Sequence, residues 1–143
     1  MNTEFTIACS KENLIHIRKF INTSLKSIGL RTTDLNLIVL AIDEVCANLI
    51  IHSNDCDYRK KLTISCEYDN SNNFLQITIR DEGKLFKYKT YNEPELDKII
   101  KDKRKGGIGL LLVRKIMDNI EYTSDQVYNI TKLTKKINPH SLA

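Results

Sequence analysis

The stretch "RKGGIGLLLVRKIMD", residues 104–118, places three glycines within four residues directly before an apolar helical pattern. Two explanations fit such a glycine run. It can be a chain reversal before a helix, or a cradle in which main-chain amides surround a phosphate at the N-terminus of the helix. The glycines alone do not decide, because the helix dipole contributes only about 0.3–1 kcal/mol per charge at exposed sites. The choice depends on the segments that precede them.

Length and composition favour one globular domain spanning residues 1–143, because a chain of this size can surround a single core. The chain is 41% hydrophobic and 28% charged, which is typical of soluble globular proteins. The net charge is +4, and basic residues gather in 84–105 and 132–136, so attraction for anions is expected to be local. No DNA- or RNA-binding motif accompanies them, and we expect no direct contact with nucleic acid.

The cysteines favour a reducing compartment. Cys9, Cys46, Cys56 and Cys66 are too far apart for a CxxC metal site, and we expect structural thiols. No charged segment followed by an apolar run opens the chain, and no apolar run approaches the roughly 20 residues that a membrane span needs. We therefore expect a cytoplasmic protein that makes no membrane contact.

Two helices are predicted in the N-terminal part of the chain. Leu14 to Ile28 carries apolar residues at helical spacing, with Ser10 as a candidate N-cap and Gly29 as a residue that can end the helix. A second helix of about twenty residues follows "RTTD", residues 31–34, whose Thr and Asp side chains can cap it. This second helix is apolar on nearly all sides, which predicts that it packs between other elements.

Strand patterns surround these helices. Period-two alternation marks "EFTIAC" (4–9), "KLTISCEY" (61–68) and "FLQITIR" (74–80), and the turn-rich "DNSNN" between the last two predicts an antiparallel hairpin. A helix over 108–118 precedes a last pair, "IEYTS" (120–124) and "VYNITKLTK" (127–135). We expect an α/β two-layer sandwich, with a mixed, mostly antiparallel sheet covered on one face by helices. A doubly wound parallel fold fits poorly because hairpins dominate.

Residues 81–105 form the longest irregular connection and are rich in lysine. A short helix can start near Pro94, where proline suits the first helical position. Connections of this length are usually lids or tethers, and the basic side chains here would suit a lid over an anion.

Polar residues interrupt the apolar second helix at one spacing. Glu44 and Asn48 stand at i and i+4, so they project from the same face. They are either a solvated stripe on a half-buried helix or a functional pair that needs partners. His52 continues the stripe, and at a helix end it is more often a satisfied polar residue than a ligand.

Asp81 and Gly83 follow a strand directly in "ITIRDEGK", residues 77–84. An aspartate and a glycine at a strand end are most often a turn. In a binding site, the carboxylate would accept a hydrogen bond from a ligand amine, while the glycine would let the ligand approach the backbone.

Taken together, the three segments resemble a known set of boxes. Their order and spacing are similar to the N box, the Asp-x-Gly box and the glycine-rich box of the Bergerat-type ATP-binding fold of DNA gyrase, histidine kinases and mismatch-repair ATPases. The stretches "LAIDEVCANLIIH" (40–52), "ITIRDEGKLF" (77–86) and "RKGGIGLLLVRKIMDNIEY" (104–122) look specifically like the bacterial anti-sigma factor serine kinases. The resemblance covers nearly the whole chain and favours the phosphate cradle for the glycines.

This resemblance implies roles for individual residues. Asn48 matches the asparagine that holds Mg²⁺ against the ATP triphosphate, and Asp81 the aspartate that receives the adenine amine, with Gly83 beside it. Glu44 matches the glutamate that can act as general base towards an attacking hydroxyl. The implied phosphate-binding segment comprises Arg104, Lys105, Gly106, Gly107, Ile108 and Gly109.

The sequence departs from the family pattern at two places. Leu85 stands where the Asp-x-Gly box often carries a second glycine. Near the C-terminus, Asn129 and Thr131 stand where the family frequently has a Gly-Thr pair that helps to bind adenine, and Thr131 is the candidate for an adenine contact.

The resemblance therefore implies an ATP-dependent protein serine/threonine kinase that acts as an anti-sigma factor or a similar partner-switching regulator. Its implied partners are a sigma factor, an anti-anti-sigma antagonist or both, and a second copy of the chain in a homodimer. An alternative is a non-catalytic module that binds ATP as a signal and sequesters a partner. A plain ATPase ranks last, because no transducer domain accompanies the three boxes.

Overall fold

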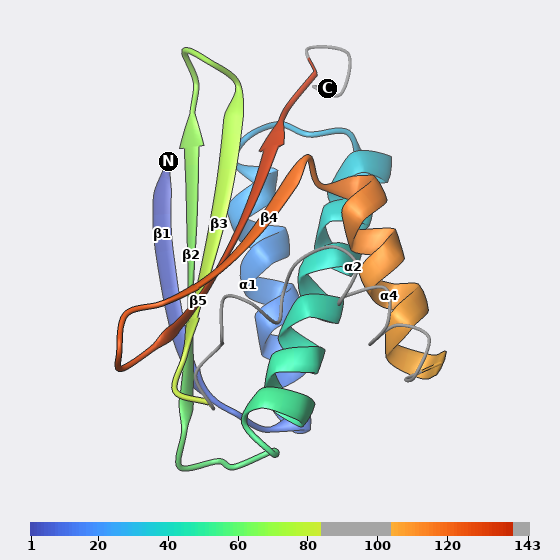
Figure 1. The fold of residues 1–143 in the computed structure, drawn as a ribbon. Coiled ribbons are helices and arrows are strands. Elements are labelled where there is room, and N and C mark those ends of the chain that lie inside the picture. The colour runs from blue at the N-terminus through green and yellow to red at the C-terminus, as the bar shows by residue number, and fades with distance from the viewer. Residues whose placement is uncertain (84–103, 139–143) are drawn as a thin grey trace.

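In the computed structural model of this chain, a sheet forms one layer and helices form the other (Figure 1). The structure describes residues 1–83 and 104–138. Five strands form the described sheet in the order β1-β2-β3-β5-β4, and every neighbouring pair is antiparallel. The strands are β1 (Asn2–Ala8), β2 (Lys61–Asp69), β3 (Phe74–Asp81), β4 (Asn119–Ser124) and β5 (Asn129–Lys136). The predicted α/β sandwich and the hairpin of β2 and β3 are confirmed.

The helical layer covers one face of this sheet (Figure 1). Helix α1 packs against α2, and α2 packs against α4. The helices are α1 (Leu14–Lys26), α2 (Thr32–Asn48) and α4 (Arg104–Ile116), with a 3₁₀ turn η1 (Lys11–Asn13) before α1 and a π-helical turn η2 (Leu49–Ser53) after α2. Helix α2 lies between the other two helices, as predicted, but its burial is one-sided: the buried residues recur at helical spacing from Leu35 to Cys46, whereas Leu37 and Leu40 are exposed.

Local sequence explains where the first helices begin and end. The Ser10 hydroxyl accepts a hydrogen bond from the Glu12 main chain at 3.3 Å, so Ser10 caps the η1 turn that leads into α1. Gly29 has a φ of +85°, a conformation that glycine adopts without strain. The prediction of a side-chain cap for α2 was wrong, since its N-cap is Arg31, which makes no side-chain capping bond.

The core lies between the sheet and the helices. Alternate residues of β2 and β3 are buried, and the register pairs Ile64 with Ile79 and Cys66 with Ile77 on that face. Phe5 of β1 stacks on Phe20 of α1 with the ring centroids 5.1 Å apart. Full burial of each large aliphatic side chain contributes about 1.5–3 kcal/mol. The regular alternation therefore attaches the helical layer to one face of the sheet.

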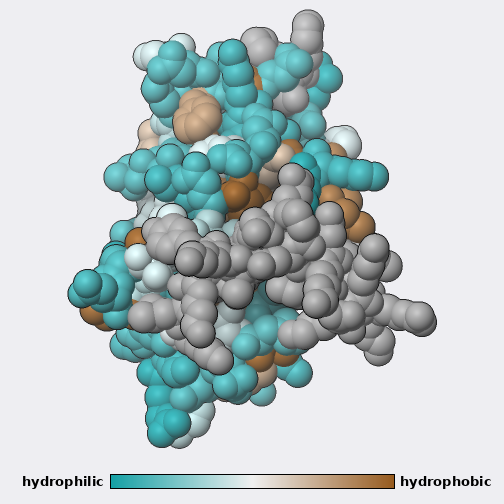
Figure 2. All heavy atoms as spheres, in the orientation of Figure 1, coloured by the Kyte–Doolittle hydropathy of each residue, from teal (hydrophilic) through white to brown (hydrophobic). Residues whose placement is uncertain are grey.

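The segment formed by α2 and η2, Thr32–Ser53, is long and apolar enough by length and composition to cross a membrane. The expectation that no apolar run approaches this length was therefore wrong for this segment. Its buried residues, including Ile38, Ile42 and Cys46, belong to the hydrophobic core, and the core helix of a globular protein meets the same criteria. On the face drawn in Figure 2, hydrophobic residues form small separate areas among hydrophilic ones.

The four cysteines are thiols. Cys9, Cys46 and Cys66 are buried and Cys56 is half-buried. Burial raises the pKa of the Cys9 thiol to about 11 and that of Cys66 to about 12. These groups therefore stay protonated at neutral pH and pack as small apolar side chains.

Candidate functional site

Asp81 is the last residue of β3 and continues the buried alternation of Leu75, Ile77 and Ile79. Its side chain is fully buried on the face that carries the helices. Oδ1 of Asp81 accepts three hydrogen bonds, from the Gly83 main chain at 2.9 Å and from the side-chain amides of Asn54 and Asn129, each at 3.2 Å. The aspartate is therefore more than a turn residue, because donors from three different segments converge on it.

The second oxygen of Asp81, Oδ2, is buried without a hydrogen-bond partner among the described residues. Burial is the largest influence on this carboxyl and raises its pKa, while the bonds from Gly83, Asn129 and Asn54 act in the opposite direction. A buried acceptor without a partner is costly. Oδ2 can therefore receive a hydrogen bond from a ligand donor such as an amine.

Two more buried atoms near Asp81 have no partner in the described part of the chain, namely Thr131 Oγ1 and Asn54 Oδ1. Asp81 lies opposite Asn129 across β3 and β5, and Thr131 lies opposite Ile79. Thr131 is fully buried and takes the same face as Asp81 because it is two residues from Asn129 along β5. The sheet thus brings Thr131 to the side of the carboxylate, where the family resemblance also implies a base contact.

Gly83 and Asn54 connect this end of β3 to the helical layer. A Cβ added at Gly83 would lie 2.8 Å from Asp81 Oδ1 and would overlap the main-chain carbonyl of Ser53 at the end of η2. Asn54 donates from Nδ2 to the Leu49 carbonyl at 2.7 Å as well as to Asp81. Glycine is therefore required here for close packing. The end of η2 and the end of β3 are held together by this packing and by the hydrogen bond from Asn54 to Asp81.

Glu44 and Asn48 share one face of α2, as their spacing predicts. Asn48 is the last residue of α2, directly before the π-helical turn η2, and its Nδ2 is buried with no partner among the described residues. Local π-helical turns occur frequently at functional sites. The Asn48 side chain is therefore not fully used by the fold and has capacity to bind a further group.

The Glu44 carboxyl is half-buried, and burial, followed by the charge of Asp43, raises its pKa. Asp43 itself pairs with Arg18 of α1 at 3.0 Å. A carboxylate with a raised pKa is a stronger base than one in water, so the surroundings of Glu44 suit proton transfer.

Helix α4 lies directly against Glu44. A Cβ added at Gly109 would overlap Oε1, Cδ and Cγ of Glu44. This contact joins the glycine segment to the α2 face that carries Glu44 and Asn48. Gly109 therefore has a packing role, since an alanine would have to displace the glutamate or the helix.

The start of α4 differs from the prediction. We expected a glycine loop followed by a helix over 108–118, whereas α4 runs from Arg104 to Ile116 and includes the glycines. Each glycine disfavours a helix by about 1 kcal/mol relative to alanine, and packing against α2 outweighs that preference. The first turn of this helix is therefore Arg104, Lys105, Gly106 and Gly107, followed by Ile108. Its leading amides lack intrahelical partners and can face an anion.

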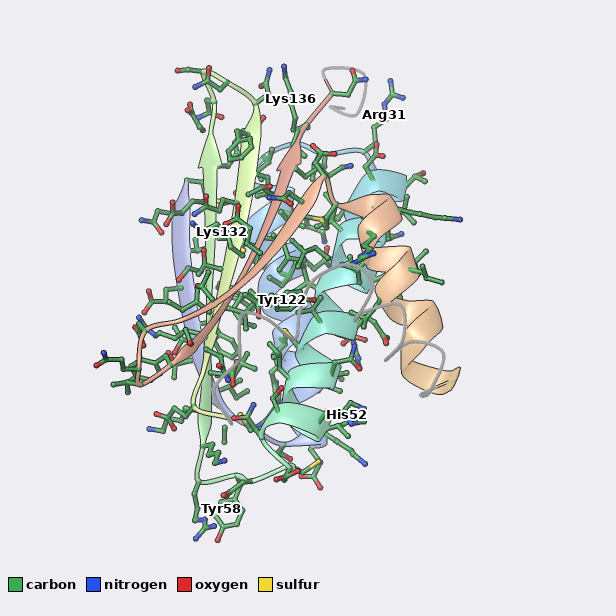
Figure 3. All side chains as sticks on the ribbon, in the orientation of Figure 1. Arg31, His52, Tyr58, Tyr122, Lys132 and Lys136 are labelled. Carbon is green, nitrogen blue, oxygen red and sulfur yellow. The ribbon has the colours of Figure 1, made fainter. Side chains whose placement is uncertain are left out.

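The structure thus places five of the predicted site residues in two groups. Asp81, Gly83 and Thr131 surround the end of β3, and Glu44 meets Gly109 between α2 and α4. His52 is exposed and projects from the end of the α2 segment away from the sheet, so it joins neither group (Figure 3). Leu85, the lysine-rich lid and the helix expected near Pro94 lie outside the described residues.

Sequence reasoning missed Asn54. It lies just after the helix in "HSNDCD", residues 52–57, where an asparagine ordinarily indicates only a turn. Asn129 was noticed as a departure from the family pattern, but its bond to Asp81 follows from the β3–β5 register. No local pattern in the sequence reveals either contact.

Comparison with known proteins agrees with this arrangement. The profile of the histidine kinase-like ATPase domain family matches residues 7–135. Among curated relatives, the serine-protein kinase RsbW of Halalkalibacterium halodurans is 24% identical over 139 residues, covering 93% of this chain and 83% of that protein. The serine-protein kinase RsbW of Bacillus mycoides is 24% identical over 127 residues, covering 86% and 78%.

A solved structure shares the fold. The crystal structure of the RsbU and RsbW domains of a Mycobacterium tuberculosis protein superposes with a TM-score of 0.67 at 14% sequence identity. The match covers 95% of this chain and 32% of that chain, so this chain corresponds to about a third of the larger protein.

Proposed function

The chain belongs to the histidine kinase-like ATPase domain family, and on that premise we propose that it is an ATP-dependent protein serine/threonine kinase of the anti-sigma factor type. It transfers the γ-phosphoryl group of ATP to a serine or threonine of an antagonist protein. The resemblance to the bacterial anti-sigma factor serine kinases is supported by the curated relatives named as serine-protein kinases and by the shared fold.

One observation carries the nucleotide assignment, namely the half-used carboxylate of Asp81. Oδ1 accepts hydrogen bonds from three donors, while the buried Oδ2 accepts none from the part of the chain that the structure describes. An ionised carboxylate accepts hydrogen bonds and donates none, which matches an exocyclic amine of adenine and mismatches a carbonyl at that position. Thr131 Oγ1, also buried and without a partner among the described residues, can donate to a ring nitrogen of the same base.

The phosphates would lie towards the start of α4, where leading amides and the helix dipole favour an anion. Arg104 and Lys105 add formal positive charge to that turn, and Gly106, Gly107, Ile108 and Gly109 continue it. We propose that Asn48 would hold Mg²⁺ through its carboxamide oxygen, which is a hard ligand, while its buried Nδ2, without a partner among the described residues, would donate to a phosphate oxygen. When bound, Mg²⁺ would neutralise phosphate charge.

Glu44 is the proposed general base. It is half-buried, its pKa is raised, and it contacts the glycine segment at Gly109. Because phosphoryl transfer needs mainly positioning and charge neutralisation, the task of Glu44 is to orient and deprotonate the acceptor hydroxyl. Its contact with α4 means that the acceptor must approach where α2 and α4 meet.

The wider setting follows from the same premise. We propose that residues 1–143 act as one ATP-binding domain in the cytoplasm, as a homodimer, without direct contact with nucleic acid or membrane. The partners are a sigma factor, an anti-anti-sigma antagonist or both. The alternative remains a non-catalytic module that binds ATP and sequesters a regulatory partner, because the half-used Asp81 supports nucleotide binding in either case.

A transfer assay separates these two functions. The protein is incubated with γ-labelled ATP, Mg²⁺ and its antagonist, and label on the antagonist is followed beside ATP binding by calorimetry. Binding with transfer of label to serine or threonine supports the kinase. Binding of both ATP and antagonist without any transfer would establish the binding module instead.

A further inference from the structure

The three donors to Asp81 come from different parts of the fold. The Gly83 amide lies two residues away on the same chain segment, and Asn129 lies on the neighbouring strand β5. Asn54 follows η2 and is the donor that reaches Asp81 from the helical layer. Resting on the proposed function, we propose that Asn54 is a positioning residue. It orients the Asp81 carboxylate towards adenine and links that carboxylate by hydrogen bonds to the helix that carries Asn48.

The contacts of Asn54 support this role. Its side chain is fully buried, and Nδ2 donates both to Asp81 Oδ1 at 3.2 Å and to the Leu49 carbonyl at 2.7 Å. The Asn54 main-chain amide donates to the same carbonyl at 3.0 Å. Leu49 directly follows Asn48 in the chain. The two hydrogen bonds from Asn54 Nδ2 therefore link the neighbour of Asn48, the proposed Mg²⁺ ligand, to Asp81, the proposed acceptor of the adenine amine.

The fold alone does not explain an asparagine at this position. The Asn54 main-chain amide already satisfies the Leu49 carbonyl, and Oδ1 of Asn54 is buried with no partner among the described residues. A buried amide oxygen without a partner destabilises a fold, whereas an apolar side chain of similar size would not. The asparagine therefore serves its contact with Asp81.

The physical effect concerns the plane of the Asp81 carboxylate. The terminal torsion of an aspartate is broad, so a carboxylate held by few donors samples many orientations. The donors that converge on Oδ1 restrict this rotation. They fix the plane of the carboxylate and therefore the direction in which Oδ2 points. Without Asn54, the Gly83 and Asn129 donors remain, but the contact from the helical layer is lost.

Calorimetry with two nucleotides tests this role in the full chain. ATP carries the exocyclic amine, whereas purine riboside 5′-triphosphate lacks it. We expect the wild type to prefer ATP by at least about tenfold, since a hydrogen bond to a charged group has that magnitude. In Asn54→Ala the preference should fall to about threefold or less, while affinity for the amine-free nucleotide stays within about twofold.

Asn72→Ala is the matched control. Asn72, in the exposed turn between β2 and β3, donates from Nδ2 to Asp69 at 2.8 Å. The substitution therefore removes the same kind of hydrogen bond outside the site. This variant should retain the wild-type preference. An Asn54→Ala protein that keeps the preference, or that weakens equally towards both nucleotides, would overturn the positioning role. A wild type without any preference would instead overturn the assignment of Asp81 to the amine.

Nuclear magnetic resonance of the wild type gives an answer even if Asn54→Ala does not fold. The side-chain amide signals of Asn54 should shift more with ATP than with purine riboside 5′-triphosphate, because only ATP engages the carboxylate that Asn54 holds. Equal shifts with both nucleotides would count against the proposal. The signals of Asn72 should not move with either.

Discussion

At the scale of single residues, Asp81 combines opposed influences in one side chain. Burial raises the pKa of its carboxyl, while the hydrogen bonds to Oδ1 favour the charged form. The hydrogen bonds therefore offset only part of the desolvation, and the charged form of Asp81 is less favourable in the fold than in water. Such a cost at a buried position is typical of a functional group, because an apolar residue would be more stable there.

The first prediction concerns Asp81→Asn. The asparagine oxygen can keep the bonds from Gly83, Asn54 and Asn129, but its amide group places a donor where the adenine amine must be accepted. ATP affinity should fall by at least about tenfold in a folded protein. Calorimetry with Mg-ATP measures this loss. Asp69→Asn, at the exposed end of β2, is the control and should bind ATP normally. Unchanged ATP affinity of Asp81→Asn would refute the assignment of Asp81 to the adenine amine.

The difference in the free energy of unfolding between the wild type and Asp81→Asn is predicted to depend on pH. The folded pKa of Asp81 is raised above its ordinary value of 3.8, so the folded state binds more protons than the unfolded state between those two pKa values. The free energy of unfolding of the wild type should therefore fall, relative to Asp81→Asn, as pH rises from about 3.8 through the raised pKa. Urea unfolding of both proteins from pH 4 to 7 measures the difference. A constant difference would contradict the raised pKa.

A second prediction separates chemistry from binding at Glu44. Glu44→Gln keeps the shape of the side chain, so ATP affinity should be unchanged, while transfer of label should fall by about 10²- to 10⁴-fold. Because burial and Asp43 raise the pKa of Glu44, the wild-type rate should increase with pH through that raised value. Equal transfer by both proteins would remove Glu44 as the base. Glu67→Gln, in an exposed position on β2, is the control.

At the scale of elements, the contact between α4 and α2 depends on Gly109. The glycine allows the two helices to approach until the backbone of α4 meets the Glu44 side chain. The C-terminal end of α4 is fixed differently, because Lys135 of β5 donates to the Ile116 carbonyl at 2.6 Å. One end of α4 is thus attached to the sheet, and the other lies on the proposed catalytic face of α2.

A double-mutant cycle tests this contact. Gly109→Ala should destabilise the wild type by about 1 kcal/mol, because overpacking at Glu44 exceeds the gain in helix propensity. In a Glu44→Ala background the overlap is absent, so the same substitution should stabilise by up to about 1 kcal/mol. Urea unfolding of the four proteins measures the coupling. An identical effect of Gly109→Ala in both backgrounds would contradict the contact.

At the scale of the whole molecule, the sheet has β1 and β4 as its outer described strands. The family resemblance implies a homodimer, and β1 pairs with β2 alone among the described strands, so its other edge can pair with a second copy. We therefore predict a dimer in solution. Light scattering with and without ATP measures the mass, and a monomer at high concentration in both conditions would disprove it.

The thiols report on the integrity of the same core. Cys9, Cys46 and Cys66 are buried and their pKa values are raised, whereas Cys56 is half-buried. We predict that one thiol of the native protein reacts quickly with a disulfide reagent at pH 8 and that all four react in guanidinium chloride. Rapid reaction of three or more thiols in the native protein would contradict the packing of this core.

Much of the fold can be predicted from local sequence, because each element is encoded by its own period. The alternation in residues 61–68 and 74–80 gives β2 and β3, and "DNSNN" joins them as a hairpin. The i, i+4 spacing of Glu44 and Asn48 places both on one face of α2, since helix geometry alone fixes that relation. The start of α4 was predicted less well, because glycine propensity favours a loop and packing against α2 decides otherwise.

The sequence by itself therefore determined the strands, the helices and the identity of the polar residues that stand out from them. Only the tertiary structure decided which of these residues meet. Asn54, Asn129 and Gly83 converge on Asp81 because the β3–β5 register and the end of η2 bring in donors that lie up to 48 residues from Asp81 along the chain. Gly109 meets Glu44 because α4 packs on α2. Such contacts depend on the packing of separate elements, which no local period in the sequence records.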